Sequence, residues 1–302
     1  TRATMNPGGP VLHRALYANW EEPPEAMAFE LTLFEALADL QGRLARILPG
    51  LERALSDPGA APSTFWDDCL DLYLRAPALV NIALNHKICV EQGLPLHPTH
   101  YFEVGEKHRH QVTYPEAQVA QAQAFFLAAI AAARAVVALA PEAPAALADL
   151  QREVPDAIRH FVYTSTRDRY TWRASEPRKI QRLADDVRRA IRPAALVGAA
   201  HGSIMAGLLL AHLLDAPLYF IRFSLFKRKD TAPVIAPSDL ACLTAYRRGP
   251  VLLFDEDVAK GTTLGQFSHF LKPFFDEAYS AGVLRHRHAG FRPDFVGEVW
   301  SD

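Results

Sequence analysis

The chain has 302 residues, 50% of them hydrophobic and 22% charged, which is enough apolar material for one large core or two smaller ones. The formal net charge of −2, without a basic run interleaved with aromatic residues, speaks against nucleic acid as a partner. The most apolar stretch, the Ala-rich residues 124–140, is interrupted by Arg134 and falls short of the roughly 20 residues of a membrane span, so no membrane segment is expected.

The cysteine content points to a reducing compartment. Cys69, Cys89 and Cys242 form neither an even set nor a metal-binding spacing, so we expect a cytoplasmic protein without disulfides. No signal peptide is visible, and residues 1–4 look like a remnant ahead of Met5.

Charge is distributed unevenly along the chain. Residues 1–150 contain 10 Lys and Arg against 17 Asp and Glu, a net charge of −7, whereas residues 151–302 contain 22 against 17, a net charge of +5. A polyanionic substrate is therefore expected on the second half of the chain.

The first half is predicted to be helical. After an irregular, Pro- and Gly-rich segment at 5–24, apolar residues recur at helical spacing in four segments: 29–47, about 64–84, about 115–139 and about 143–153. Pro77 is expected to bend or split the second helix, and Thr113 and Glu116 have the spacing of a capping box for the third. Residues 93–113 are predicted to form a loop or a short hairpin. These patterns together predict an all-helical N-terminal domain of residues 1–155.

The second half alternates between helical and strand patterns. Ser175 is expected to cap a first helix that ends at Ile191. The later elements are strand 194–199, helix 203–214, strand 218–222, strand 251–254, helix 262–278 and a short strand near 294–300. This alternation predicts an α/β domain of residues 156–302 with a parallel sheet, whose ligands bind at the carboxyl ends of the strands.

Residues 251–264, VLLFDEDVAKGTTL, form the most informative motif. An apolar strand leads into Asp255 and Glu256, and Gly261 then permits a tight turn into a helix whose first N–H groups face outward. Such a helix start binds phosphate, whereas the two carboxylates suit Mg²⁺ or vicinal hydroxyls. The loop therefore fits one ligand that carries a phosphate and a diol.

This motif resembles the phosphoribosyl pyrophosphate (PRPP) binding motif of type I phosphoribosyltransferases. The resemblance implies that Asp255 and Glu256 lie along the ribose hydroxyls and bind Mg²⁺. It implies a 5-phosphate loop formed by Ala259, Lys260, Gly261, Thr262 and Thr263. Two positions depart from the family pattern. Asp257 replaces an apolar residue, and Ala259 replaces an Asp that serves as a proposed base in the 6-oxopurine enzymes, which weakens an assignment to purine salvage.

A second loop follows the first strand of the α/β half. Its small residues allow close approach to an anion, and the resemblance implies a pyrophosphate-binding role for Ala199, Ala200, His201 and Gly202. His201 could donate a hydrogen bond to pyrophosphate or cap the next helix.

Basic residues follow the next strand. Arg222 and Lys227 resemble the pyrophosphate-binding strand end and loop of orotate-type enzymes, although a solvated charge run is an alternative for 227–229.

Two further segments are candidates for contacts with the acceptor. Residues 292–297, RPDFVG, resemble a strand of hypoxanthine–guanine phosphoribosyltransferases in which the Phe stacks on the base, so Phe295 is either a stacking platform or a core residue. The loop with His97, His100, His108 and His110 lacks a standard metal spacing and is interpreted as a polar loop that could cover the acceptor.

Together these features predict an enzyme that transfers the 5-phosphoribosyl group from PRPP to a small-molecule acceptor, with Mg²⁺ as cofactor, Asp255 and Glu256 as catalytic groups and pyrophosphate as product. The acceptor is not identified by the sequence, and a homodimer is expected. Two alternatives stay open: a regulator that senses PRPP or a nucleotide without turnover, and an interaction protein whose helical half is the working part.

Overall fold

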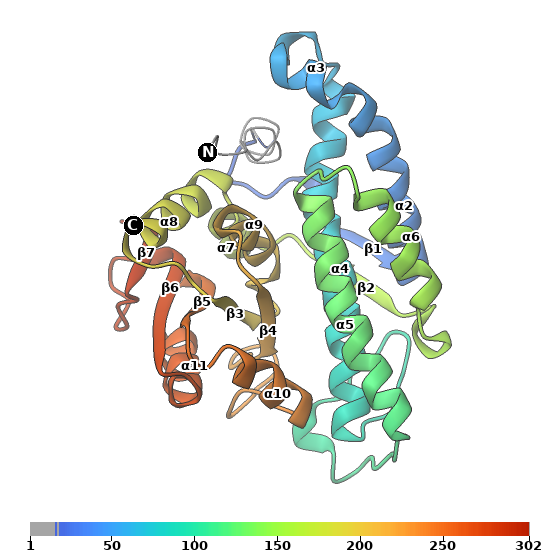
Figure 1. The fold of residues 1–302 in the computed structure, drawn as a ribbon, viewed down its shortest axis with the longest axis vertical. Coiled ribbons are helices and arrows are strands. Elements are labelled where there is room, and N and C mark those ends of the chain that lie inside the picture. The colour runs from blue at the N-terminus through green and yellow to red at the C-terminus, as the bar shows by residue number, and fades with distance from the viewer. Residues whose placement is uncertain (1–15, 17, 302) are drawn as a thin grey trace.

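A computed structural model describes residue 16 and residues 18–301, apart from the side chain of Leu55. The interpretation of residues 1–4 and most of the irregular segment predicted at 5–24 fall outside the described residues. Figure 1 shows a helical part standing beside an α/β core, with the long helix α4 (Ser63–Gln92) between them.

The α/β core contains a five-stranded sheet in the order β4-β3-β5-β6-β7, with all neighbours parallel. Its strands are β3 (Ala195–Ala200), β4 (Leu218–Arg222), β5 (Pro250–Val258), β6 (Glu277–His286) and β7 (Phe295–Trp300). The helices of the core are α7 (Arg169–Ala174), α8 (Pro177–Ala190), α9 (Ile204–Leu214), α10 (Pro237–Ala245) and α11 (Thr262–Leu271). Because β4 lies on one side of β3 and β5 on the other, the order of the strands reverses between β3 and β5. In open parallel sheets, ligands bind at the carboxyl ends of the strands at such a point.

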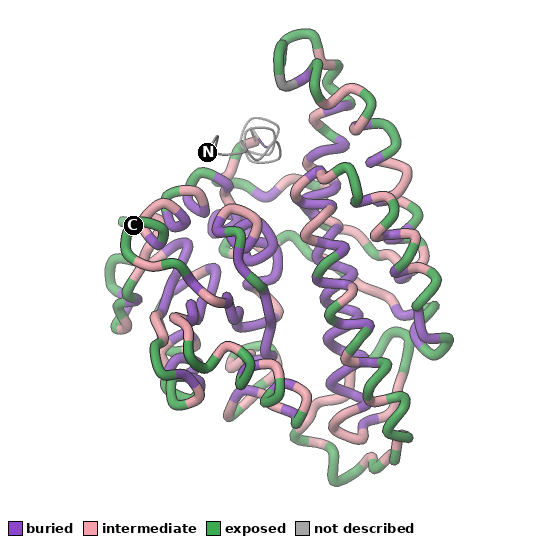
Figure 2. Tube along the Cα trace, viewed as in Figure 1, coloured by how far each residue is buried: buried purple, intermediate pink, exposed green. Residues whose placement is uncertain are grey.

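The helical part consists of α2 (Leu33–Ile47), α3 (Leu51–Ser56), α4, α5 (Glu116–Val137) and α6 (Ala143–Glu153). Helix α4 packs against α2 and α5 on the helical side and against α9 of the core. Every residue of α4 from 76 to 90 is buried, as Figure 2 shows. A helix that is covered on all sides belongs to the interior, so α4 joins the two parts of the molecule through one continuous hydrophobic core.

Helix α5 is, by length and composition, the one described helix that could cross a membrane, despite Arg134. However, 44% of its most apolar stretch is buried inside the protein, and the Arg134 side chain donates to the carbonyl of Ala211 in α9 at 3.4 Å. The helix therefore packs as a wall of the helical part, against α4, α6 and α9.

The predicted α/β core with a preceding helical part is confirmed, with one addition. Strand β1 (Phe29–Thr32) pairs antiparallel with β2 (Val162–Ser165), so the segment predicted as a helix from residue 29 begins as a strand. Its helix starts only at Leu33, where Thr32 and Glu35 form a capping box. Phe29 fits the helical spacing of the residues after it by chance. A four-residue strand is too short for its alternating pattern to be distinguished from a helical one.

Several predicted boundaries are wrong. Pro77 lies inside the continuous helix α4, so the predicted split there is wrong, while the alternative of a bend stays a prediction. Neither Thr113 nor Ser175 is the N-cap of its predicted helix, because α5 and α8 have Pro115 and Glu176 at their N-caps. Ser175 is instead the C-cap of α7. The last predicted helix ends at Leu271 rather than at 278. A short 3₁₀ helix (Lys272–Phe274) follows, and then β6, which the sequence pattern missed.

Candidate functional site

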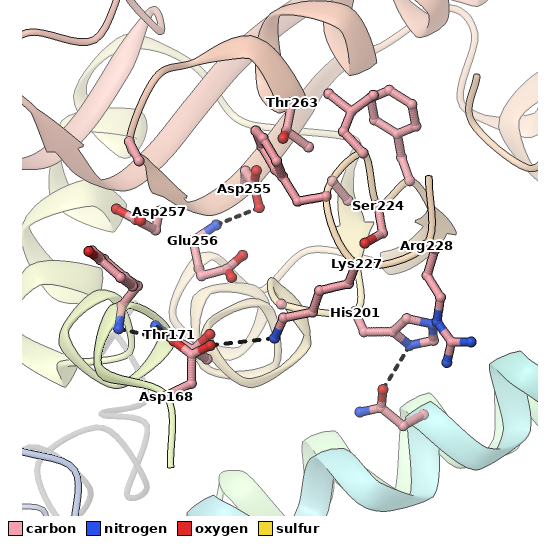
Figure 3. Close-up of a pocket in the computed structure, with 18 of the residues that line it drawn as sticks. Asp168, Thr171, His201, Ser224, Lys227, Arg228, Asp255, Glu256, Asp257 and Thr263 are labelled. Carbon is pink, nitrogen blue, oxygen red and sulfur yellow. Dashed lines mark hydrogen bonds and ion pairs between the residues drawn. The ribbon is translucent and has the colours of Figure 1, made fainter. Parts of the chain in front are cut away.

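A cavity of about 770 Å³ opens at the carboxyl ends of β3 and β5, between the core and the helical part. The core contributes the loops after β3, β4 and β5. The helical part contributes residues of α4 and of the loop between α4 and α5, and strand β2 and the first turn of α7 complete the wall. Figure 3 shows the charged side chains that face one another across this space.

The acidic triplet lies at the end of β5, which runs on through Asp255 and Glu256 to Val258. Asp255 and Glu256 are each 8% exposed, and neither carboxylate forms a salt bridge within the described residues. Burial raises the pKa of Asp255 to about 6, although hydrogen bonding with Glu256 opposes this shift and the charge of Asp257 adds to it. Burial, together with the neighbouring Asp255, raises the pKa of Glu256 well above its usual value. The Oε2 atom of Glu256 is buried and has no hydrogen-bond partner among the residues that the structure describes. The site thus concentrates acceptor oxygens that lack a cation.

Asp257 has a partner that the other two acids lack. Its Oδ1 lies 2.9 Å from Nε2 of His286 at the end of β6. Burial raises the pKa of Asp257 to about 6, although the contact with His286 opposes the shift. Asp257 lines the cavity, so His286 orients this third carboxylate.

The loop predicted to bind the 5-phosphate leads from β5 into α11. Gly261 has a φ of +81°, and a Cβ there would lie 2.5 Å from Cβ of Phe291, so this turn requires glycine. Thr262 and Thr263 start α11 and do not cap it with their side chains. The first N–H groups of a helix have no intrahelical acceptor, and those of α11 start at the cavity wall. The five residues from Ala259 to Thr263 all line the cavity.

The loop after β3 meets the acidic triplet. A Cβ at Gly202 would lie 1.9 Å from Oε1 of Glu256, so only glycine fits between the two. Ala199, His201 and Gly202 line the cavity, while Ala200 is buried and joins His201 through a cis peptide bond. The helix-cap alternative for His201 is wrong, because Ser203 is the N-cap of α9. Nδ1 of His201 instead lies 2.8 Å from Oδ1 of Asn81 in α4.

Arg222 and Lys227, the two basic residues predicted to bind pyrophosphate, lie in different environments. Arg222 is 1% exposed, forms ion pairs with Asp230 at 2.8 Å and Glu103 at 3.6 Å, and does not line the cavity. Lys227 lines the cavity and reaches Asp168 at 3.4 Å, with 79% of its side chain exposed. Lys227 is therefore available to a ligand, whereas Arg222 already has carboxylate partners.

The two segments predicted to contact an acceptor also differ. Phe295 begins β7, packs beside the Tyr279 ring at 5.8 Å, and is not brought to the cavity. The loop from residue 93 to 113 does reach it through Thr99 and Tyr101, but its four histidines do not. The part of the chain that the structure describes contains no group of three or more His, Cys, Asp or Glu side chains suited to a metal ion.

Sequence reasoning missed the contribution of α4 and α7. Asn81 and Asn85 line the cavity, and two amides four residues apart at the end of the mostly apolar stretch 76–85 were the available signal. Asp168 lines the cavity as the N-cap of α7, and its Oδ1 accepts hydrogen bonds from the N–H groups of Tyr170 and Thr171. An Asp before a short helical segment is a cap pattern that could have predicted α7.

No protein-family model and no curated protein sequence matches the chain. Three similar solved structures are phosphoribosyltransferases by name. Purine phosphoribosyltransferase from Pyrococcus horikoshii Ot3 is 23% identical over 42% of this chain and 83% of its own, with a TM-score of 0.35. Xanthine-guanine-hypoxanthine phosphoribosyltransferase from Helicobacter pylori is 22% identical over 39% of this chain and 77% of its own, with a TM-score of 0.31.

The third, orotate phosphoribosyltransferase from Aeropyrum pernix, is 18% identical over 45% of this chain and 74% of its own, with a TM-score of 0.30. Identities below 25% and TM-scores below 0.5 say nothing about activity, so the function rests on the residues of the cavity.

Proposed function

We propose that the cavity binds PRPP together with Mg²⁺ and that the protein transfers the 5-phosphoribosyl group to a small acceptor, releasing pyrophosphate. One observation supports this most directly. Two buried, cation-free carboxylates and the N–H groups of a helix start share one wall of a cavity, five to eight residues apart along the chain. A ligand with a phosphate at one end and a diol near the other satisfies both groups at once.

The donor set fits Mg²⁺. Asp255 and Glu256 offer carboxylate oxygens, and the unpaired Oε2 of Glu256 is an acceptor that a cation would satisfy. Mg²⁺ is commonly bound by one or two carboxylates together with substrate phosphates, so two protein ligands suffice. When bound, the ion would neutralise charge on the pyrophosphate oxygens.

The residues of the chain would act mainly by positioning and electrostatics. The N–H groups at Gly261, Thr262 and Thr263 would hold the 5-phosphate, and the carboxylates of Asp255 and Glu256 would orient the ribose hydroxyls. Lys227 and the loop at His201 and Gly202 lie where pyrophosphate would depart. The bond from C1 to the pyrophosphate oxygen breaks with its electron pair on pyrophosphate, while a lone pair of the acceptor forms the new bond to C1.

Calorimetric titration with Mg·PRPP tests the binding step. We expect Asp255→Asn and Glu256→Gln each to weaken binding by about 1–3 kcal/mol, because each removes a charge-assisted hydrogen bond. Glu116→Gln, an exposed carboxylate at the start of α5, is the control and should leave the affinity unchanged. Unchanged affinity in both cavity variants, or a soaked structure with phosphate away from residues 261–263, would contradict the proposal.

A pyrophosphate-release assay with candidate acceptors separates turnover from sensing. Release that depends on both Mg²⁺ and an acceptor supports an enzyme. Tight Mg·PRPP binding without release for any acceptor would favour a PRPP-sensing regulator, the alternative suggested by Ala259 at the position where the 6-oxopurine enzymes carry an Asp proposed as a base. A cytoplasmic location, a homodimer and a domain boundary at residue 155 remain predictions.

A further inference from the structure

The side of the cavity that faces away from the pyrophosphate is the side open to an acceptor. A lone pair that forms a bond to C1 approaches from the face opposite the departing group, and the loop at His201 and Gly202 lies where pyrophosphate would depart. Figure 3 shows Asp257 and His201 on opposite sides of Glu256, with Thr171 of α7 on the Asp257 side. The acceptor is therefore expected between the end of β5 and the first turn of α7, both of which line the cavity.

Asp257 presents a fixed carboxylate to this side. It is in register with Leu284 of β6, and Nε2 of His286 at the end of that strand lies 2.9 Å from its Oδ1. An ionised carboxylate only accepts hydrogen bonds, so Nε2 of His286 is the donor. Both side chains are at most 12% exposed. Because a carboxylate has two oxygens with about four lone-pair sites, Asp257 can accept a further hydrogen bond from a ligand.

Aromatic rings hold the ring of His286 in place. Trp300 meets it edge-on with 4.7 Å between the ring centroids, and the ring of Tyr170 lies 6.2 Å away at an interplanar angle of 33°. Trp300 is in turn covered by the guanidinium group of the buried Arg173, at 4.7 Å. Contacts from β6, β7 and α7 thus set the orientation of Asp257 before any ligand binds.

Tyr170 contributes an exposed aromatic ring to the same part of the wall. It lines the cavity, yet it is 56% exposed. The N–H groups of Tyr170 and Thr171 donate to Oδ1 of Asp168, which fixes this first turn of α7. An exposed ring on a fixed backbone is a platform on which a flat ligand can stack, and stacking removes its apolar face from water.

The charge on this side of the cavity is negative. Burial is the main cause that raises the pKa of Asp257, and the contact with His286 opposes it. The charges of Glu256 and Asp168 add to the rise, so the three carboxyl groups lie close enough to act on one another. A carboxylate on the acceptor would meet like charge here, whereas an N–H or amino group would find an oxygen that accepts its hydrogen bond.

We propose that Asp257 and the ring of Tyr170 form the acceptor subsite and select a flat aromatic acceptor that presents an N–H or amino group and no carboxylate. His286 is the positioning residue, because it holds the carboxylate of Asp257. The inference rests on the proposed function for the role of its ligand as the acceptor. It gives the third acid of residues 255–257 a task distinct from that of the pair that binds the ribose and Mg²⁺.

Three probes of the same shape test the inference on the full chain. Benzamidine, benzamide and benzoate carry a cationic, a neutral and an anionic group on one ring, and each is titrated without PRPP and followed by ligand-observed NMR. We expect benzamidine to bind most tightly, and benzamide to bind about tenfold more tightly than benzoate. Mg·PRPP added afterwards should leave benzamide bound, because the two occupy different parts of the cavity. Displacement of benzamide by Mg·PRPP would overturn the inference.

Substitutions in the wall assign the preference to its residues. Asp257→Asn keeps the shape of the side chain and should lower the preference for benzamide over benzoate about tenfold, because an amide can also donate to a carboxylate. Tyr170→Ala should weaken benzamide and benzoate alike, by about three- to tenfold, whereas Tyr170→Phe should bind both as the wild type does. Asp149→Asn, an exposed carboxylate of α6 outside the cavity, is the control and should preserve the preference.

His286 is tested by rescue. His286→Phe should lower the preference because Asp257 is no longer held, and His286→Gln should restore it because an amide N–H still donates. Equal or tighter binding of benzoate by the wild type, no binding of any probe, or full preference in Asp257→Asn would overturn the inference. Full preference in His286→Phe would overturn the positioning role.

The outcome is separable from that of the proposed function. Wild-type protein that binds Mg·PRPP but does not prefer benzamide over benzoate refutes the acceptor subsite alone. Wild-type protein that shows this preference, and loses it in Asp257→Asn, but does not bind Mg·PRPP refutes phosphoribosyl transfer and leaves a site for aromatic N–H donors.

Discussion

Two buried groups of charged residues in this protein differ in whether their charges are paired. Between α4 and α10, Lys87 contacts Glu91 at 2.6 Å and Asp239 at 2.7 Å, and all three side chains are at most 4% exposed. The hydroxyl of Tyr219 also donates to Asp239. At the end of β5, Asp255 and Glu256 are similarly buried but lack a cation within the described residues.

The difference separates a structural role from a binding role. Paired and hydrogen-bonded charges can be buried without a ligand, and the Lys87 group ties α10 to the helical part. Unpaired carboxylates in a cavity raise the free energy of the folded protein. This cost falls when a cation or a hydroxyl group binds to them. Buried charge without a partner is thus the stronger indication of function.

The largest effect on stability is expected from a substitution that removes the cation of the paired group. Lys87→Met should lower the free energy of unfolding by about 3–5 kcal/mol, because it leaves two buried carboxylates without a cation. Urea unfolding followed by circular dichroism measures this, with Lys107→Met in the exposed loop as the control. A loss below about 1 kcal/mol would show that the pairing does not stabilise the fold.

Removing charge from the unpaired group should have the opposite effect. Asp255→Asn should stabilise the protein by about 1–3 kcal/mol at pH 7, while it weakens Mg·PRPP binding. The folded-state pKa of Asp255 is raised to about 6 from 3.8, so the folded protein holds this proton more tightly than the unfolded chain does. The wild type therefore loses stability as the pH rises from about 3.8 to 6.

The pH dependence of this gain provides the check. The advantage of Asp255→Asn should be complete above pH 6, shrink as the pH falls below it, and vanish near pH 4. Thermal unfolding of both proteins from pH 4 to pH 8 measures it. A gain that does not vary with pH would mean that the ionisation of Asp255 is not its cause.

A smaller effect, on Mg·PRPP affinity, is expected where the loop after β3 meets Glu256 at the end of β5. Gly202→Ala places a methyl group 1.9 Å from Oε1 of Glu256 and should weaken Mg·PRPP binding about tenfold, close to 1.4 kcal/mol. Gly105→Ala has nothing within 4 Å of its Cβ and is the matched control. If calorimetry finds equal affinities in both variants, the loop at 199–202 does not approach the ligand.

The smallest effect concerns an exposed pair. Lys227→Ala breaks the contact with Asp168 but should change stability by less than about 1 kcal/mol, because the lysine is 79% exposed. The same variant should make Mg·PRPP affinity less sensitive to salt, which titrations at two salt concentrations reveal. A stability loss above 2 kcal/mol would place Lys227 in the structural class with Lys87.

The sequence alone predicted the elements whose pattern is local. Helix α6 and strand β4 were predicted with the bounds that the structure has, and the loops at 199–202 and 259–263 were placed at the strand ends where the cavity lies. A continuous apolar run or a sustained helical period is a property of neighbouring residues, and glycine at a tight turn follows from its backbone freedom.

Only the tertiary structure decided what depends on distant partners. Residues paired between β1 and β2 are 130 to 136 positions apart in the sequence, and β6 completes a sheet between β5 and β7. None of these three strands therefore showed a clear local signal. The partners of Arg222 and the absence of Phe295 from the cavity likewise follow from packing. Above all, Asn81 and Asn85 become part of the site only because α4 is buried against the core, a contact that no spacing within α4 encodes.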